Sequence, residues 1–185
     1  MSSGRERFQG DVPDSNLGIA WVEQLRLGST DALEAMLAVY WQPLLDYAST
    51  ILRNPDSAQD VVQQAFIRLW QGRRDWRTGS SARSLLFTIV RNLALNERRS
   101  QRMHERWVRS SQPARAGPPP PDQVFDHNEL SDAVTRAIEA LPLRRKEVFT
   151  LSRFQGFSYE QIAEVLGISA QTVANQMSLA MAQLR

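Results

Sequence analysis

Four consecutive prolines at residues 118–121 divide the sequence into two parts. Proline lacks a backbone N–H and fixes φ near about −65°, so a proline run excludes a helix or a central strand and favours extended polyproline geometry. The run lies within a stretch rich in small and polar residues, residues 110–125, which we interpret as a flexible linker. The sequence therefore predicts two small folded domains, residues 17–109 and 126–185, after a disordered tail at residues 1–16.

Both domains are expected to be all-helical, because apolar residues recur at every third or fourth position and no segment alternates as a strand does. Local signals mark helix starts: Asn54 is followed by Pro55, and Ser158 with Gln161 forms a capping box. Gly167 is expected to end a helix in the left-handed conformation. The helices are expected at residues 17–26, 29–51 with an interruption at Pro43, 54–71, 82–108, 128–140, 143–154, 158–166 and 170–184.

The composition excludes several classes of protein. The sequence has no cysteine, so it forms neither a disulfide framework nor a thiolate metal site. No apolar run approaches the ~18 residues of a membrane span, and the N-terminus lacks an apolar signal core. We therefore expect a soluble, cytoplasmic protein with no membrane insertion, no metal and no cofactor. The sequence also lacks a glycine-rich phosphate loop and a nucleophile–base set, which argues against an enzyme.

The charge of the chain is unevenly distributed. Residues 67–115 contain twelve arginines and three acids, whereas residues 1–66 contain four basic and nine acidic side chains. A dense basic block of this kind is typical of a surface that binds a polyanion such as nucleic acid. The alternative is a solvated helical face, and the charge alone does not separate the two interpretations.

Residues 158–177, SYEQIAEVLGISAQTVANQM, have the pattern of a helix-turn-helix. Ala163 is small where two helices would cross, Gly167 suits the turn, and apolar residues fill the positions of a small core. The alternative is an ordinary helical hairpin. In the DNA-binding interpretation the second helix lies in the major groove, where Asn and Gln side chains can pair with adenine edges. This helix carries no charge before Arg185, so phosphate contacts are expected from elsewhere, such as Arg144, Arg145, Lys146 and Arg153.

The helix predicted at residues 60–70 has two different faces. Val62, Ala65, Phe66 and Leu69 form an apolar stripe that is expected to face the core. Polar side chains and Ile67 lie on the other side, and this mixture suits a docking surface for another protein. A slightly apolar exposed face explains the same pattern equally well.

Three segments together resemble the sigma factor family of bacterial RNA polymerase. The segment DSAQDVVQQAFIRLW resembles its polymerase-binding segment, and SLLFTIVRNLALNERRS resembles the segment that recognises and melts the −10 promoter element. The segment AIEALPLRRKEVFTLSRFQGFSYEQIAEVLGISAQTVANQM resembles its −35-reading domain. The order, the spacing and the linker are similar to those of the extracytoplasmic-function (ECF) group, and the resemblance covers residues 31–185.

This resemblance implies three groups of functional residues. The residues that match the helix that docks on the polymerase core are Asp60, Gln63, Gln64, Phe66, Leu69 and Trp70. The residues that match the −10-binding surface are Trp76, Arg91, Asn92, Asn96, Arg98, Arg99 and Arg102. The residues that match the −35-binding surface are Arg144, Arg145, Lys146, Gln171, Thr172, Asn175 and Gln176.

Two departures from the family pattern bear on these residues. The family usually has Glu at the position of Gln64 and a Lys or Arg on the recognition helix, so the resemblance predicts altered polymerase docking and altered −35 binding. The loop at residues 73–81 matches the family loop that captures a base flipped out of the DNA, which costs a few kcal/mol. Trp76 in this loop is expected either to stack on a base or to pack on its own loop.

The resemblance implies a transcription-initiation factor whose partners are the RNA polymerase core subunits, promoter DNA and an anti-sigma factor. The alternative is a free-standing helix-turn-helix regulator that binds duplex DNA without polymerase. The basic helix around residues 91–109 favours the first interpretation, because a free-standing regulator does not need a second DNA-facing surface.

Overall fold

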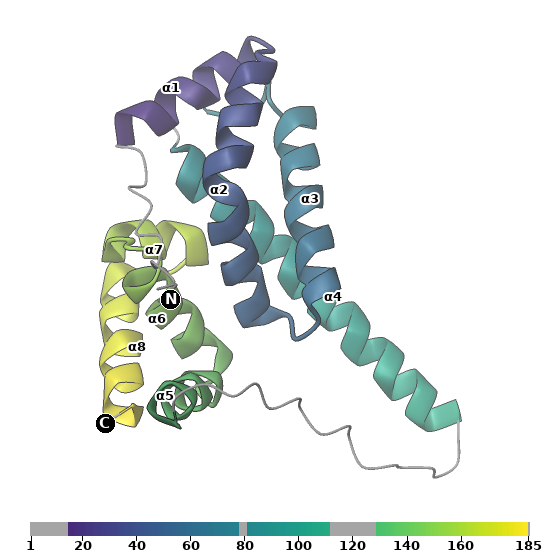
Figure 1. The fold of residues 1–185 in the computed structure, drawn as a ribbon, viewed down its shortest axis with the longest axis vertical. Helices are drawn as coiled ribbons and strands as arrows, with labels where there is room; N and C mark the ends of the chain where they lie inside the picture. The colour runs from purple at the N-terminus through teal and green to yellow at the C-terminus, as the bar shows by residue number, and fades with distance from the viewer. Residues whose placement is uncertain (1–14, 78–80, 112–128, 185) are drawn as a thin grey trace, which may run out of the picture.

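The computed structural model describes residues 15–77, 81–111 and 129–184, and these residues form eight α-helices (Figure 1). The expected tail, most of the expected linker and part of the loop at residues 73–81 lie outside the described residues. The helices are α1 (Ser15–Arg26), α2 (Thr30–Ile51), α3 (Pro55–Gln71), α4 (Ala82–Ser111), α5 (Glu129–Glu139), α6 (Leu143–Arg153), α7 (Tyr159–Leu166) and α8 (Ala170–Gln183).

Helices α1–α4 form an N-terminal unit. Helices α2 and α3 lie side by side, α1 crosses one end of them, and α4 runs obliquely behind and extends well beyond the bundle (Figure 1). Their apolar stripes meet in a core that includes fully buried Tyr40, Leu44, Leu69, Leu86 and Phe87. Burying side chains of this size contributes about 1.5–3 kcal/mol each, which is the main force that holds the bundle together.

Pro43 does not interrupt the second helix, which corrects the prediction from the sequence. Helix α2 is continuous from Thr30 to Ile51 with Pro43 inside it. A proline removes one backbone hydrogen bond and costs about 3 kcal/mol in a helix interior. The buried side chains on either side of it, Tyr40, Leu44 and Tyr47, pack into the core and offset that cost.

The structure confirms the predicted cap of α3 and shows which residue caps α2. Asn54 caps α3, because its side-chain oxygen accepts hydrogen bonds from the backbone N–H groups of Asp56 at 2.8 Å and Ser57 at 3.2 Å. Asp31 with Glu34 resembles a capping box in the sequence, but the cap of α2 is Ser29, whose hydroxyl accepts from the Ala32 N–H at 3.3 Å. Helix α4 continues three residues past the predicted end at residue 108.

Helices α5–α8 form a C-terminal unit, in which α6, α7 and α8 enclose a small core of Val148, Leu151, Ile162, Val173 and neighbouring side chains. The predicted helix-turn-helix geometry is present at α7 and α8. The capping box of Ser158 and Gln161 has both of its hydrogen bonds, and Gly167 adopts φ 64° and ψ 44°. The left-handed backbone conformation costs glycine little, whereas it would strain any residue with a side chain at this position.

Helix α5 is packed less deeply than the other helices of the C-terminal unit. Val134 in this helix is 53% exposed, whereas Leu141, two residues after its end, is buried. The reason lies in the arrangement of the helices, because α6, α7 and α8 close the small core among themselves.

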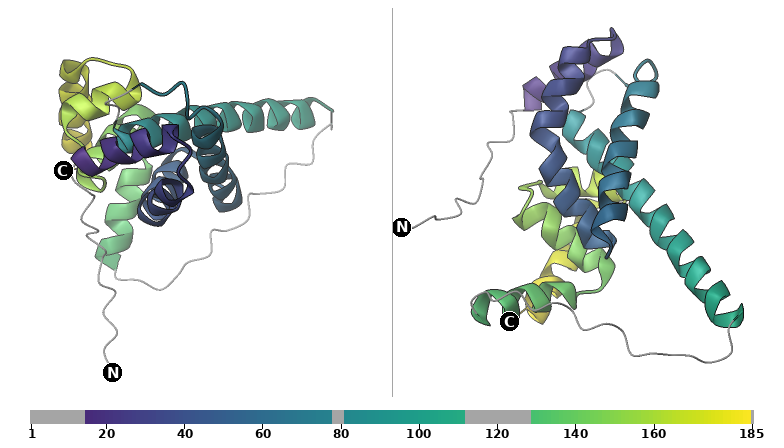
Figure 2. Two further views of the ribbon diagram at one scale, coloured as in Figure 1. Left: turned by 90° about the horizontal axis from the view of Figure 1, so that it is seen from above. Right: turned by 45° about the vertical axis from the view of Figure 1, so that its right-hand side comes forward.

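The two units pack against each other instead of standing apart. Helix α2 contacts α6, and α4 contacts α7, so that one apolar cluster runs through both units. The rings of Phe87 on α4 and Phe157 before α7 meet with centroids 4.9 Å apart. The views in Figure 2 agree that α6 and α7 lie against the N-terminal bundle. The sequence predicts two domains but gives no sign of this contact.

Candidate functional site

The outer face of α3 presents a continuous stripe of exposed side chains. Asp60, Gln63, Gln64 and Ile67 are all exposed, and they lie three or four residues apart, which puts them on one side of the helix. Ile67 exposes 42% of its surface. An apolar side chain among polar neighbours, of which only Asp60 is charged, suits a protein-binding surface. We refer to these four residues as the α3 stripe.

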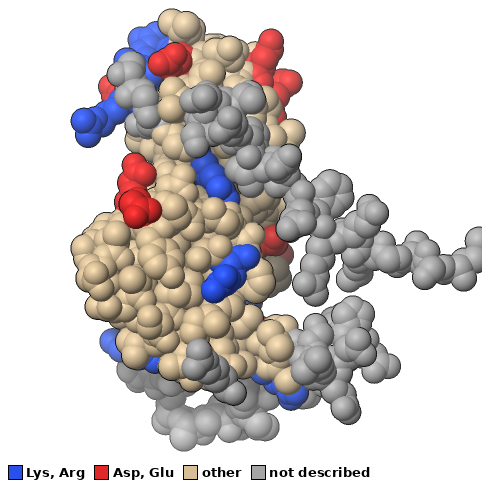
Figure 3. All heavy atoms as spheres, turned by 90° about the vertical axis from the view of Figure 1, so that its left-hand side faces the viewer, with Lys and Arg blue, Asp and Glu red and all other residues tan. Residues whose placement is uncertain are grey.

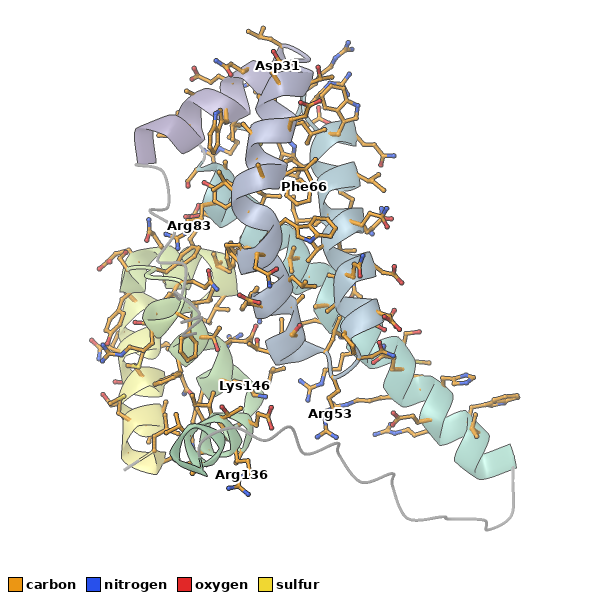
Figure 4. All side chains as sticks on the ribbon, in the orientation of Figure 1. Asp31, Arg53, Phe66, Arg83, Arg136 and Lys146 are labelled. Carbon is orange, nitrogen blue, oxygen red and sulfur yellow. The ribbon has the colours of Figure 1, made fainter. Side chains whose placement is uncertain are left out.

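Two residues predicted for the same docking surface lie inside the molecule. Phe66 is 5% exposed and Leu69 is fully buried, and Phe66 points from α3 toward α2 (Figure 4). Its ring stacks near Trp41 of α2, with centroids 6.3 Å apart. Both residues therefore position the α3 stripe from below and cannot themselves touch a partner in this structure. The family resemblance assigned both the exposed stripe residues and these two buried residues to the docking surface, because it does not distinguish residues that touch a partner from residues that support them.

The end of α3 and the turn after it form a packed corner. Trp70 is half-buried and lies under the Arg73 guanidinium, which is 4.3 Å from the ring centroid. The Trp76 indole N–H donates to the Leu69 carbonyl oxygen at 3.0 Å. A Cβ at Gly72 would be only 3.2 Å from the Trp76 ring, so glycine allows this close approach. Of the two expectations for Trp76, packing on its own loop describes this structure.

Part of the predicted −10 surface lies open on α4. Asn92, Asn96 and Arg99 are exposed and follow one side of the helix, and Arg102 is exposed on the next turn. Arg98 is half-buried. The exposed side chains supply amide groups, which pair with bases, and guanidinium groups, which bind phosphates. The arrangement can hold a nucleic-acid strand along α4.

Arg91 is in a different position from the other predicted −10 residues. Its Nε donates to Glu147 Oε1 of α6 at 2.7 Å, and the side chains of the pair are only 12% and 2% exposed. The Tyr47 hydroxyl of α2 donates to the same oxygen at 3.2 Å. In this conformation the C-terminal unit covers Arg91, so its contact with DNA stays a prediction for a form in which the two units have separated. Sequence analysis missed Glu147 and Tyr47, because partners so far apart in the chain leave no local signal.

Like charges converge where α4, α6 and the turn after α2 meet. Partial burial, together with Arg102 and Arg53, lowers the pKa of Arg98. Partial burial lowers the pKa of Lys146, nearby Glu139 opposes this effect, and Arg53 and Arg98 add to it. Figure 4 shows Arg53 and Lys146 at the same lower end of the molecule. Burial is the larger cause of both lowered pKa values, and Glu147 opposes the effect at Arg98. The grouping of Arg53, Arg98 and Lys146 nevertheless suits the binding of an anionic backbone.

The recognition helix α8 presents uncharged polar side chains. Gln171, Thr172 and Asn175 are exposed, while Gln176 is half-buried. The Gln171 amide donates to the Asn175 side-chain oxygen at 3.2 Å, and the Thr172 hydroxyl lies 2.8 Å from the Ser169 hydroxyl. Figure 3 shows that this side of the molecule has few charged side chains over a broad area. The groups that could read bases are therefore held by neighbours on their own helix.

The basic residues 144–146 of α6 do not lie beside these base-reading side chains. Arg145 Nη1 donates to Gln183 Oε1 at 3.0 Å, which puts it next to the last turn of α8. Gln171 is twelve residues earlier in the same helix, or about 18 Å away at about 1.5 Å per residue. Arg153 lies nearer the middle of α8, because it lines one surface hollow with Tyr159 and Ser178.

The described residues contain no group of three or more His, Cys, Asp or Glu side chains that could hold a metal ion. None of the helices in the described part of the chain combines the length and the apolar character needed to cross a membrane.

Comparison with known proteins gives consistent matches in sequence and structure. Residues 37–103 match the family model "Sigma-70 region 2", and residues 131–184 match "Sigma-70, region 4". The ECF RNA polymerase sigma factor SigL of Mycobacterium tuberculosis strain H37Rv is 32% identical over 152 residues, which cover 80% of this chain and 81% of SigL. The RNA polymerase sigma factor YlaC of Bacillus subtilis is 26% identical over 157 residues, or 84% and 91% of the two chains.

Two solved structures share the fold. One is CnrH in complex with the cytosolic domain of CnrY, with a TM-score of 0.66 and 22% identity, covering 91% of this chain and 94% of that one. The other is the sigma factor RpoE in complex with the anti-sigma factor NepR from Bartonella quintana. It has a TM-score of 0.63 and 25% identity, and covers 82% and 92% of the two chains.

Proposed function

Because this chain belongs to the ECF group of RNA polymerase sigma factors, we propose that its two helical units divide the work of promoter recognition between them. The chain directs RNA polymerase to promoters and so to transcription initiation, and it has no enzymatic role of its own. In our proposal residues 17–109 bind the polymerase core and the −10 element, and residues 126–185 bind the −35 element. The linker at residues 110–125 joins the two units. Because RNA polymerase and promoter DNA are in the cytoplasm, we propose that the protein acts there.

The observation that carries this division is the presence of two different surfaces on the N-terminal unit. The α3 stripe is uncharged apart from Asp60 and includes an exposed isoleucine, as suits a protein partner. The exposed face of α4 carries Asn92, Asn96 and Arg99, as suits DNA. A free-standing regulator needs neither surface in addition to its helix-turn-helix.

We propose that the −10 element binds along α4 with its two strands partly separated. Arg99 and Arg102 would hold phosphates, and the two asparagines would contact bases. Arg91 and Arg98 extend the same surface once the C-terminal unit has moved away. Trp76 supports the loop beside this surface through its bond to the Leu69 carbonyl.

The −35 element is proposed to bind at the start of α8. Gln171 and Asn175 can each pair with an adenine edge after they release each other, and Thr172 and Gln176 lie beside them. The absence of charge on α8 leaves phosphate contacts to α6, with Arg153 nearest and residues 144–146 at the far end. We therefore expect a −35 contact that contributes base preference and comparatively little affinity.

An anti-sigma factor is a further proposed partner. Its support is the shared fold with a sigma factor from Bartonella quintana that was solved together with an anti-sigma factor.

Transcription from a library of randomised promoters, followed by sequencing of the active templates, tests the division of labour. With core polymerase, the wild-type protein is expected to enrich two blocks of sequence. Gln171→Ala should relax the upstream block alone, and Arg99→Ala should weaken initiation from all templates through the downstream block. Gln24→Ala, at an exposed position on α1, is the matched control and should leave both blocks unchanged. A single enriched block, or a Gln171→Ala profile that matches the wild type, would overturn the proposal.

A further inference from the structure

The contact between the two units is built around one buried carboxylate. Glu147 of α6 is 1% exposed and faces the N-terminal unit, where its Oε1 accepts from Arg91 Nε at 2.7 Å and from the Tyr47 hydroxyl at 3.2 Å. The three groups come from α6, α4 and α2. An isolated buried charge is costly, so each of the two charged groups depends on the other while the units are in contact.

A second set of contacts joins the two units at the start of α4. We call the whole contact surface between the N-terminal and C-terminal units the seam. The Arg83 guanidinium lies 4.0 Å from the Phe157 ring centroid and donates to the Gln155 backbone oxygen (Figure 4). Phe87 packs against the other side of the same turn, with its ring centroid 4.9 Å from that of Phe157. Burial lowers the pKa of Arg83, as expected for a guanidinium enclosed by the seam. These contacts make the closed arrangement specific.

Closure hides one DNA-facing arginine and leaves the polymerase-docking surface free. Arg91 is covered by α6, whereas Gln63, Gln64 and Ile67 of the α3 stripe remain exposed on the outer side of the bundle. Arg91 can bond either with the Glu147 carboxylate or with a DNA phosphate, because both are anions that need the same guanidinium edge. Closing the chain and binding DNA along the whole of α4 are therefore mutually exclusive.

We propose that Arg91, Glu147 and Tyr47 form a latch that holds the free protein closed, and that the latch opens when α4 exchanges Glu147 for promoter DNA. This inference rests on the proposed function of α4 as the −10-binding helix. Polymerase docks on the closed form through the α3 stripe, and release of the C-terminal unit follows. Residues 112–128 between the units could span up to roughly 55 Å when extended, which is enough for the units to separate.

An ion pair suits this role better than an apolar contact. A buried pair gains little over apolar packing of the same volume, because both charges lose their water. When the units separate, the carboxylate returns to water and the guanidinium gains a phosphate. The closed state is therefore stable without DNA and easily opened with it.

The test measures affinity for a short, fluorescein-labelled single strand of random sequence, without polymerase. Apparent affinity is proportional to the fraction of open protein, so it reports a shift even when the open form is rare. Glu147→Gln keeps the shape of the side chain and removes its charge, and it should tighten binding about tenfold. Tyr47→Phe removes one neutral hydrogen bond and should tighten binding about threefold.

The matched control is Glu164→Gln. Glu164 is exposed on α7 of the same unit, so this change alters the net charge equally and leaves the seam intact. Any gain from the charge alone appears in both variants, and the latch accounts for the difference. Circular dichroism shows whether each variant is folded. If Glu147→Gln does not fold, Tyr47→Phe decides the question, because it changes no charge and keeps the ring in the core.

A second measurement follows the distance between the units. The natural chain has no cysteine, so Ala38→Cys on α2 and Ala182→Cys on α8 give two unique labelling sites at exposed positions. Energy transfer between the labels should be high in the free protein and should fall when the single strand is saturating. Unchanged transfer on DNA binding would overturn the latch.

Two further results would also overturn it: Glu147→Gln binding no tighter than Glu164→Gln, or Tyr47→Phe binding no tighter than the wild type. Failure of the proposed function looks different, because the protein then fails to bind core polymerase whatever the state of its seam. If it supports initiation with polymerase and yet no variant binds the strand, the function stands and the latch is wrong.

Discussion

Neighbouring residues on α3 should respond in opposite ways to substitution. Ile67 is 42% exposed on the α3 stripe, and Phe66 is 5% exposed and packs toward α2. We predict that Ile67→Asp weakens binding to core polymerase without changing stability, and that Phe66→Ala lowers stability without removing a contact to polymerase. The pair separates the docking surface from the residues that support it.

The magnitudes follow from exposure. Burying a whole isoleucine contributes about 1.5–3 kcal/mol, so covering the 42% that Ile67 exposes contributes roughly 0.6–1.3 kcal/mol. Placing a carboxylate there adds a desolvation cost of about 1–3 kcal/mol. The total corresponds to a loss of affinity on the order of a hundredfold. Phe66→Ala should lower the free energy of unfolding by about 3–5 kcal/mol, because it leaves a cavity between α2 and α3.

Fluorescence anisotropy with purified core polymerase measures the affinity, and urea unfolding measures the stability. Leu179→Asp is the control for Ile67→Asp, because Leu179 is 46% exposed on α8, away from the α3 stripe, and should affect neither quantity. Wild-type affinity in the Ile67→Asp protein would refute the reasoning. So would a Phe66→Ala protein of unchanged stability that has lost its affinity, because Phe66 would then be a contact residue.

Three further predictions concern buried or strained groups. The Thr150 hydroxyl is buried with no hydrogen-bond partner among the described residues, so Thr150→Val should raise the free energy of unfolding by about 1 kcal/mol in a urea titration. Gly167 has φ 64°, so Gly167→Ala should lower the free energy of unfolding by about 1–2 kcal/mol. An unchanged unfolding midpoint would contradict the left-handed turn. Burial, and then the Glu147 carboxylate, raise the pKa of Tyr47 well above 10.0. The folded state therefore holds this proton more tightly than the unfolded state, and stability should fall as the pH rises above 10.0. Tyr47→Phe should reduce this fall in stability. If the free energy of unfolding depends on pH above 10.0 in the same way in both proteins, the assigned role of Tyr47 is contradicted.

The parts of the fold that sequence analysis predicted well depend on neighbours in the chain. Asn54 caps a helix through backbone groups two and three residues away, and Ser158 bonds with Gln161. These short-range contacts determine the helix ends, which is why the helix-turn-helix was predictable. The positions of the exposed α3 and α4 side chains follow from helical periodicity in the same way.

The parts that could not be predicted depend on contacts between distant residues. Arg91 and Glu147 are 56 residues apart, and Tyr47 and Glu147 are 100 apart, so no local pattern reveals the seam. Pro43 reads as a helix break because propensity ignores the packing on either side of it. The family resemblance assigned Phe66 to the docking surface, whereas helical periodicity put it on the core side, where the structure has it.

Run-off transcription with purified core polymerase tests the central claim most directly. The protein is added to, or omitted from, reactions on fragments of its own genome. The account predicts transcripts with defined start sites only when the protein is present, and strong loss of these transcripts with Ile67→Asp. A protein that binds core polymerase no better than an unrelated control, and that leaves it inactive on every fragment, would contradict the account.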